Sequence, residues 1–479
     1  MIQVLINIAK FEYDIHSLVK AFFPTEDVKV VTEDSALSCE EGTVYRVHYE
    51  TEEFSFYEGD TLLGTETVKA NAARIEEKNA VKRLVYKALS ARTGRTLVWG
   101  DLTGIRPTKI PRKMLDEGKS ETEILSYMKD TYLVGDEKSV LALDIAKRER
   151  EILKPLRDKG YSIYIGIPFC PTTCLYCSFT SNPIAMWRDR VSEYLNALKK
   201  EIDFTAHARA GQIIDTVYIG GGTPTTLSAE ELEELLSYME EKLDLRNLLE
   251  FTVEAGRADS ITVDKLAVLH RHHVTRISVN PQTMNQKTLD LIGRRHTVED
   301  VIRAFNDART VGFDNINMDI ILGLPGEDTA EVTHTIDEIV KLRPDSLTVH
   351  SLAIKRGSRL YEWILNQGYA TMVNTDATMA IAAEGAERLS MKPYYLYRQK
   401  NMAGNFENTG YAREGAYGIY NILIMEELEP IVAMGPGSVS KVITREGRLV
   451  RSDNVKDVAE YIARIDEMID RKKELFSLE

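Results

Sequence analysis

The pattern of apolar and polar residues changes character near residue 155. Before that point, alternating runs such as TVYRVHY and EFSFYEGDTLLG predict hairpin strands. The segments NAARIEEKNAVKRLVYKAL and DEKSVLALDIAKREREIL show the spacing of amphipathic helices, and the first should end near Gly94. Residues 1–155 are therefore predicted to form an N-terminal α+β domain, whose role the sequence does not indicate.

From Tyr161 onward, short apolar runs alternate with helical patterns. The six runs are SIYIGI, DTVYIG, EFTVEA, TRISVN, NINMDIILG and SLTVHSL. Such alternation predicts parallel strands joined by crossover helices. A complete eight-unit barrel takes about 250 residues, so the roughly 190 residues from Tyr161 to Ser351 hold about six units. Residues 156–365 are therefore predicted to form an α/β fold, a partial (β/α)6 barrel that is open on one side.

The pattern is less regular after residue 365. NTDATMAIAAEGAERLS predicts a helix, the stretch from Tyr394 to Tyr420 is rich in Tyr, Asn and Gly, and VKDVAEYIARIDEMIDRKKELF predicts a charged terminal helix. We expect residues 366–479 to form a small C-terminal domain. Because a reactive site must be shielded from water, this domain is expected to cover the open side of the barrel and the substrate.

Charge and cysteine content narrow the classes of function. The formal net charge of -14 argues against a broad nucleic-acid interface, which needs a basic face. Neither a signal peptide nor an apolar run of membrane-spanning length is found, so a cytoplasmic location is expected. Three of the four cysteines lie within eight positions, which is not the distribution of a disulfide framework.

The clustered cysteines follow the first predicted barrel strand, in IPFCPTTCLYCSF. Cys170, Cys174 and Cys177 place three thiols on one loop. A cubane iron–sulfur cluster usually takes four thiolates, so three would leave one iron open to a ligand. A structural zinc site would need a fourth ligand, and no His lies nearby in sequence. The alternative of three buried core thiols is disfavoured by the proline-flanked loop at a strand end.

Glycines and polar residues follow the other predicted barrel strands. Gly220, Gly221 and Gly222 precede Thr223 after the second strand, and glycines permit close approach of the backbone to a ligand. A carboxylate at the carboxyl end of a barrel strand, such as Glu254 after the third, is usually functional. The later strands contribute, in order, Gln282 and Arg294, then Asp319 and Ile321, then Ala353.

The cysteine motif and these strand ends resemble the radical S-adenosylmethionine (SAM) superfamily. The resemblance implies a 4Fe-4S cluster on Cys170, Cys174 and Cys177, with the open iron chelating the amine and carboxylate of SAM. In that superfamily, an electron from the cluster cleaves SAM to methionine and a 5′-deoxyadenosyl radical. The implied SAM contacts are Tyr164 near the sulfonium, Tyr176 at the adenine, Gly221, Gly222 and Thr223 at the amino group, Glu254, Gln282, Arg294 and Asp319 at the polar parts, and Ile321 and Ala353 beside the adenine.

Within the superfamily, the chain is most similar to the oxygen-independent coproporphyrinogen III oxidase group, and in particular to its HemZ-type coproporphyrinogen dehydrogenases. Two departures separate it from better-known branches. Phe179 stands where well-known oxidases of the group have a further Cys. The heme chaperones of the group carry His-Asn-x-x-Tyr-Trp, whereas this chain has Glu407-Asn408-Thr409-Gly410-Tyr411-Ala412.

This resemblance implies an oxidoreductase of heme biosynthesis. The expected reaction is the anaerobic oxidative decarboxylation of coproporphyrinogen III to protoporphyrinogen IX, with an external electron donor such as flavodoxin or ferredoxin. No catalytic side chain beyond the cofactor-binding residues is required. The tetrapyrrole propionates need cationic partners, for which Arg398, Lys400 and Arg413 are candidates, with Arg106 and Lys109 as an alternative.

Two other functions remain open. One is a heme-binding or heme-delivery protein of the same group. The other is a different radical SAM reaction, either anaerobic heme ring opening or tRNA modification. The acidic net charge disfavours the tRNA reaction.

Overall fold

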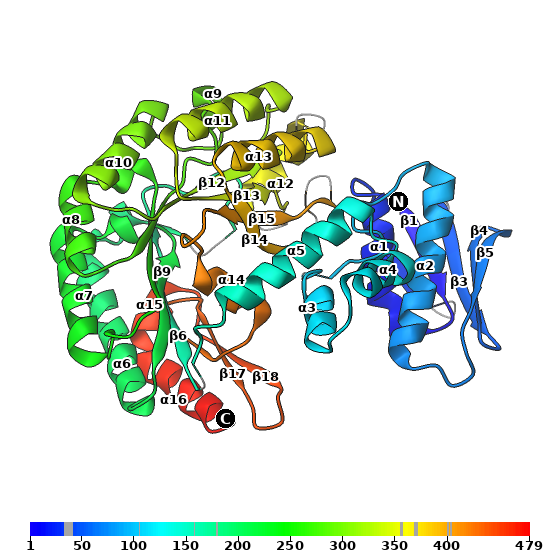
Figure 1. Ribbon diagram of the computed structural model, residues 1–479, viewed down its shortest axis with the longest axis horizontal. Coiled ribbons are helices and arrows are strands. Elements are labelled where there is room, and N and C mark those ends of the chain that lie inside the picture. The colour runs from blue at the N-terminus through cyan, green and yellow to red at the C-terminus, as the bar shows by residue number, and fades with distance from the viewer. Residues whose placement is uncertain are drawn as a thin grey trace. The chain divides into compact units, whose positions relative to one another are not determined.

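A computed structural model of the chain describes residues 1–32, 42–104, 106–157, 159–178, 181–354, 358–367, 372–399, 402 and 405–479. These residues group into two units (Figure 1). The smaller unit consists of Met1–Lys147 together with Leu396–Glu407, and the larger unit consists of Arg148–Tyr395 together with Asn408–Glu479. No helix within the described residues combines the length and apolar character needed to cross a membrane.

The smaller unit is built on a five-stranded sheet in the order β2-β1-β3-β4-β5. The predicted hairpins are confirmed, since β3 pairs antiparallel with β4 and β4 with β5. Helix α2 ends as predicted, with Gly94 in the left-handed conformation at its carboxyl end. The elements are β1 (Ile2–Ile6), α1 (Glu12–Phe22), β2 (Val28–Thr32), β3 (Thr43–Glu50), β4 (Glu53–Glu58), β5 (Thr61–Thr67), α2 (Arg74–Thr93), α3 (Lys109–Asp116), α4 (Glu121–Tyr132) and α5 (Asp136–Ile152).

A second apolar core in the smaller unit includes a residue from far along the chain. Leu396 is buried in a cluster with Trp99, Leu102, Met128 and neighbouring side chains. The chain leaves the larger unit after Tyr395, contributes Leu396–Glu407 to the smaller unit, and then returns to the larger one. The smaller unit is therefore not continuous in sequence.

Six parallel strands form the centre of an eleven-stranded sheet in the larger unit. They lie side by side in chain order, which confirms the predicted six-stranded α/β barrel. Alternate residues of these strands face the interior, so polar side chains recur there at every second position. The six strands are β6 (Tyr161–Ile167), β9 (Ile214–Gly221), β10 (Glu250–Gly256), β11 (Arg276–Val279), β12 (Ile316–Leu322) and β13 (Ser346–Ser351).

Helices cover the outer face of these strands, where they form an arc around the sheet in Figure 1. Several begin at a side-chain cap, such as Ser228 before α7 and Thr297 before α10. Their apolar faces pack against the sheet, which explains the amphipathic spacing in the sequence. They are α6 (Val191–Ala208), α7 (Ala229–Lys242), α8 (Val263–Arg271), α9 (Gln286–Leu291), α10 (Val298–Val311) and α11 (Thr329–Leu342).

The described part of residues 366–479 does not form the separate domain that the sequence suggested. Strand β15 pairs with β13, and β16 pairs with β6, so the same sheet continues at both edges. The predicted terminal helix is also divided, because the backbone leaves helical geometry at Arg464. The elements are α12 (Arg359–Gln367), α13 (Asp376–Arg388), β14 (Lys392–Tyr397), β15 (Asn408–Ala412), α14 (Ile419–Glu426), β16 (Ile431–Met434), β17 (Val439–Ile443), β18 (Leu449–Asp453), α15 (Val458–Ala463) and α16 (Ile465–Phe476).

Candidate functional site

The cysteine loop follows β6 and starts in a short strand, β7 (Phe169–Cys170), which pairs with β8 (Asn182–Pro183). Cys170 and Cys174 are buried, and Cys177 is partly exposed. The Thr223 hydroxyl donates toward the Cys170 Sγ at 3.6 Å, and the Arg257 Nη1 donates toward the Cys174 Sγ at the same distance. Donors from two other strand ends therefore face the sulfurs of this loop.

Arg257 anchors the loop to the end of the third barrel strand. Its Nη1 donates to the carbonyl oxygen and the hydroxyl of Thr172, at 3.0 and 2.8 Å. Its Nη2 pairs with the Asp259 carboxylate at 2.6 Å, and the guanidinium is almost fully buried. On the other side, the Leu175 amide donates to the Ile292 carbonyl at 2.9 Å. The loop is thus held between segments that follow β10 and β11.

The chemistry of this loop fits an iron–sulfur cluster. Burial raises the pKa of the Cys170 thiol to about 11, and the neighbouring thiols add to this effect. Binding of a cationic iron centre would offset that cost, because thiolates are its natural ligands. Among the described residues, no group of three His, Cys, Asp or Glu side chains is already arranged as a metal-binding set. The fit therefore rests on three thiols sharing one anchored loop, with donors directed at two of their sulfurs.

The glycine turn after β9 lies directly against the cysteine loop. The amides of Gly222 and Thr223 donate to the carbonyls of Ile167 and Phe169, both at 2.7 Å. A Cβ added to Gly222 would lie 2.5 Å from the Phe169 oxygen and 3.0 Å from the Cys170 Sγ. The neighbouring Gly221 has a φ of +104°, which favours glycine. This turn can approach the thiols only because its residues lack side chains.

The cysteine loop and the glycine turn at Gly222 lie at one edge of the barrel, which we call the rim. Three tyrosines and a glutamate face the barrel interior below this rim. The Tyr218 ring stacks on Tyr420 at 4.6 Å, and the Tyr164 ring lies 6.2 Å from each of them. The Tyr218 hydroxyl donates to the Glu254 carboxylate. Burial raises the pKa of Glu254 to about 7, against an ordinary value of 4.5. A cation bound beside Glu254 would favour its charged form.

Asp319 lies in the same interior in a different electrostatic setting. Its Oδ1 accepts a hydrogen bond from Asn317 at 2.7 Å, and its Oδ2 lies 3.6 Å from the His350 Nε2. Burial alone would raise the pKa of Asp319, but the hydrogen bonds and charge of His350, together with Asn317, lower it below its usual value. The interior therefore contains two carboxylates whose pKa values are shifted in opposite directions.

The fourth strand end supplies buried polar atoms without partners. Gln282 is 8% exposed and has a φ of +69°, and its Oε1 has no hydrogen-bond partner among the described residues. Arg294 donates from Nη2 to the Tyr176 hydroxyl at 3.2 Å, while its Nε is also buried without a partner. Because buried polar atoms are usually satisfied, these positions suit the polar groups of a bound molecule.

The remaining predicted SAM contacts lie at the ends of β12 and β13. Ile321 is buried and pairs in register with His350, and Ala353 lies two residues beyond β13. The residues that the resemblance assigned to the cluster or SAM lie on the barrel strands or in the segments that follow their carboxyl ends, the side on which barrel enzymes place their active sites.

The predicted propionate partners are not placed in this way. Arg398 is 4% exposed in the smaller unit, where its guanidinium donates to the carbonyl of Leu102 and to Asn405. Arg413 donates to the Leu389 carbonyl and pairs with Asp345, next to the amino end of β13. Both arginines therefore already donate to backbone carbonyls, Arg398 at a buried position and Arg413 next to the start of β13. Lys400 lies outside the described residues, as does Phe179. The alternative pair, Arg106 and Lys109, belongs to the smaller unit.

Four residues of the site were not predicted from the sequence. Tyr218 and His350 lie two positions from predicted strand ends, and the period-2 pattern of a strand could have placed them in the interior. Arg257 follows the third strand directly, which was a usable signal. No local pattern marks Tyr420, because it belongs to α14, about 200 residues or more after the strand tyrosines that it contacts.

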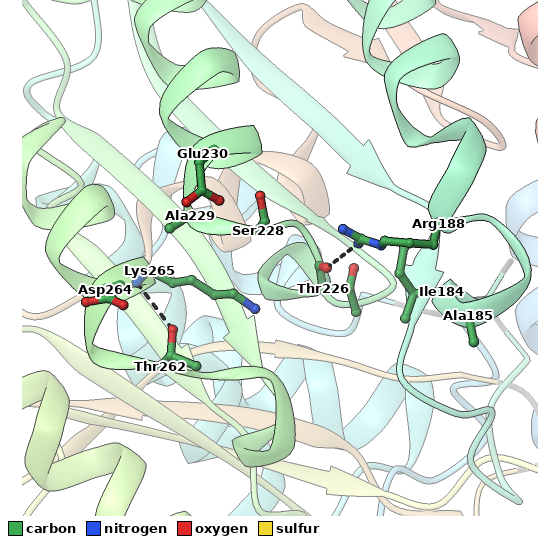
Figure 2. Close-up of a pocket in the computed structure, with 10 residues that line it drawn as sticks. All are labelled: Ile184, Ala185, Arg188, Thr226, Ser228, Ala229, Glu230, Thr262, Asp264 and Lys265. Carbon is green, nitrogen blue, oxygen red and sulfur yellow. Dashed lines mark hydrogen bonds between the residues drawn. The ribbon is translucent and has the colours of Figure 1, made fainter.

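A surface depression of about 490 Å³ lies near this rim (Figure 2). Arg188 Nη2 donates to the Thr226 carbonyl at 2.9 Å, and the Lys265 ammonium donates to the carbonyls of Thr225 and Ser260. These cations already have protein partners, and none of the predicted site residues lines the depression. The lining residues are Ile184, Ala185, Arg188, Thr226, Ser228, Ala229, Glu230, Thr262, Asp264 and Lys265.

Comparison with known proteins agrees with this arrangement. The family model of the radical SAM superfamily matches residues 164–339. The chain is 42% identical over 402 residues to the oxygen-independent coproporphyrinogen-III oxidase-like protein HemZ of Bacillus subtilis, covering 82% of this chain and 80% of that protein. It is 39% identical over 202 residues to the heme chaperone HemW of the same organism, covering 42% of this chain and 52% of HemW.

Among solved structures, coproporphyrinogen III oxidase (HemN) from Escherichia coli has a similar fold. The TM-score is 0.51 at 22% identity, over 67% of this chain and 72% of that chain. The extended match to HemZ, with the thiols and strand ends described above, establishes the family. The chain belongs to the radical SAM superfamily and, within it, to the HemN/HemZ family of proteins related to coproporphyrinogen III oxidase.

Proposed function

We propose that this protein catalyses the anaerobic oxidative decarboxylation of two propionates of coproporphyrinogen III, giving the two vinyl groups of protoporphyrinogen IX. The observation that carries the proposal is the rim itself. It brings the three thiols, the glycine turn at Gly222 and the Glu254 carboxylate to the carboxyl ends of one set of parallel strands. The identity to a protein described as coproporphyrinogen-III oxidase-like supports this reaction class.

Cys170, Cys174 and Cys177 would hold a 4Fe-4S cluster, and the strand ends described above would hold SAM. When bound, these groups supply one-electron chemistry that removes a hydrogen atom from a propionate β-carbon. Loss of carbon dioxide and one electron from the substrate then leaves a vinyl group. An electron donor such as flavodoxin or ferredoxin and an electron acceptor are required from outside the chain.

The side chains of the barrel interior would orient SAM and exclude water. The absence of a side chain at Gly222 lets the glycine turn lie directly against the Cys170 sulfur. The Glu254 carboxylate would pair with a positive group of SAM, which gives a use for a carboxylate at a position where burial disfavours its charge. The stacked rings of Tyr164, Tyr218 and Tyr420 close the interior beneath, and a dry site protects a reactive substrate from side reactions.

Heme delivery is the competing function, because the chain is also similar to the heme chaperone HemW. The position of the chaperone motif argues against it. Glu407 is 1% exposed, and its carboxylate accepts hydrogen bonds from the Trp99 Nε1 at 2.7 Å and the Lys138 Nζ at 2.6 Å. A buried carboxylate occupied by two donors is poorly suited to bind heme iron.

The test is an anaerobic incubation of the cluster-loaded protein with SAM, a reductant and coproporphyrinogen III, followed by mass spectrometry. We expect protoporphyrinogen IX and 5′-deoxyadenosine, with none from a Cys170→Ala control. Parallel samples receive heme instead of the porphyrinogen. Stable stoichiometric heme binding without decarboxylation would favour the chaperone function, and a linear tetrapyrrole would favour ring opening; either result would overturn the proposal.

A further inference from the structure

His350 is a titratable side chain that the proposed reaction leaves without a role. It lies on the barrel-interior face of β13, next to the carboxyl end, and its side chain is 27% exposed. Its Nε2 lies 3.6 Å from the Asp319 Oδ2, within the range of an ion pair. The same imidazole acts electrostatically on Glu254. His350 thus lies beside one carboxylate of the proposed SAM site and acts on the charge of another.

The other oxygen of Asp319 is held by a directed chain of hydrogen bonds. The buried Arg276 donates from Nη2 to the Ser346 hydroxyl at 3.1 Å, and this hydroxyl donates to the Asn317 Oδ1 at 3.0 Å. The Asn317 amide then donates to the Asp319 Oδ1 at 2.7 Å. Hydrogen bonds that run in one direction reinforce one another. These hydrogen bonds hold one oxygen of the Asp319 carboxylate. A contact at the other oxygen is needed to limit rotation of the carboxylate.

Both strands that neighbour β12 contribute to this support. The series of hydrogen bonds begins on β11 and passes through β13 before it reaches β12. His350 approaches Asp319 from β13, near the rim. A carboxylate supported at both oxygens presents a single orientation to a ligand, and groups that orient a binding residue affect affinity without touching the ligand.

We propose that His350 is a positioning residue that orients the Asp319 carboxylate for SAM. This inference rests on the proposed function, since it assumes that Asp319 binds a polar part of SAM. His350 is assigned no contact with SAM, and its effect is assigned to Asp319, whose Oδ2 it faces at 3.6 Å, rather than to Glu254.

SAM affinity tests this inference without depending on turnover. Calorimetric titration of the cluster-loaded protein would compare His350→Ala, His350→Gln, Asp319→Asn and the double variant His350→Ala/Asp319→Asn with wild type. We expect His350→Ala to weaken SAM binding about tenfold, the size of one lost contact with a charged group. His350→Gln should restore most of the affinity, because its amide can donate to the same oxygen. His207→Ala, an exposed histidine on α6, is the matched control and should bind as wild type.

The double variant separates positioning from direct contact. If His350 acts through Asp319, adding His350→Ala to Asp319→Asn should cause almost no further loss. Additive losses would show an independent contact and overturn the inference, as would unchanged affinity in His350→Ala. Loss of affinity in His350→Ala that Gln does not restore would indicate general damage and would also overturn it. Failure of the wild-type protein to bind SAM would instead refute the proposed function, on which the inference rests.

Discussion

Glu254 lies in a part of the barrel interior where a carboxylate is poorly solvated. Burial raises its pKa to about 7, the nearby Asp319 contributes in the same direction, and the hydrogen bond from Tyr218 offsets only part of the effect. A residue that is costly to ionise in the free protein is ready to pair with a cation. The free-energy cost of ionising Glu254 and its contribution to SAM binding can be measured separately.

Glu254→Gln is expected to stabilise the ligand-free protein and to weaken SAM binding. A raised carboxyl pKa means that the folded protein holds the proton more tightly than the unfolded chain. The corresponding stability is present below about pH 4.5 and is lost as the pH rises through about 7. At pH 8, Gln should therefore raise the free energy of unfolding by about 2 kcal/mol. Urea denaturation at pH 8, combined with a SAM titration, measures both effects.

The two halves of this prediction can fail separately. Lower stability of Glu254→Gln at pH 8 would show that the carboxylate is well supported in the free protein. Unchanged SAM affinity would remove Glu254 from the binding site.

At the level of elements, the turn after β9 is defined by what its glycines lack. The site for a side chain at Gly222 is filled by the Phe169 carbonyl and the Cys170 sulfur, and both belong to the adjacent cysteine loop. The order of the strands produces this contact, since β6 and β9 are neighbours and end at the same level. The turn and the loop therefore form one structural unit.

Gly222→Ala is expected to displace the cysteine loop. The added methyl would meet backbone atoms that cannot rotate away, at a cost of about 1–3 kcal/mol, and iron uptake on reconstitution should fall sharply. Gly104→Ala is the control, because no atom lies within 4 Å of its added Cβ. Iron analysis after reconstitution gives the answer. Equal iron content in the two variants would contradict the contact between turn and loop.

Local patterns predicted the elements well where each element carries its own signal. The six barrel strands are apolar runs flanked by helices, and the three thiols are close in sequence, so both could be assigned. Strand β16 was missed because its pairing with β6 depends on a partner about 270 residues away, and β17 and β18 extend the sheet from β16. Arg398 was misjudged for the same reason, since its partner carbonyl belongs to Leu102. Charge in a sequence does not show which carbonyl a guanidinium will meet.

At the level of the whole molecule, the chain returns to the smaller unit with Leu396–Glu407 after building most of the barrel. Glu407 ends that segment, and its carboxylate is held by Trp99 and Lys138 in the interior of the unit. The division into three consecutive domains therefore does not hold, because Leu396–Glu407 belongs to the smaller unit and the residues on either side of it belong to the larger one.

Glu407→Gln should destabilise the protein by about 3 kcal/mol, because it leaves the buried Lys138 ammonium without its counter-charge. Glu121→Gln removes the partner of Lys147 from an exposed pair of the same length and should have little effect. Urea denaturation compares the two variants. The account of this segment would be contradicted if both variants unfolded at the wild-type midpoint.

The central claim is that Cys170, Cys174 and Cys177 hold a four-iron cluster with one iron open to SAM. Electron paramagnetic resonance of the reduced, reconstituted protein tests it most directly, together with iron analysis. We predict about four irons per chain, a cubane signal that changes when SAM is added, and loss of both in the triple Cys→Ala variant. Replacement of the fourth cysteine, Cys39, which lies outside the described residues, by Ala should leave both unchanged. A triple variant that keeps four irons, or a cluster signal that SAM leaves unchanged, would contradict the account.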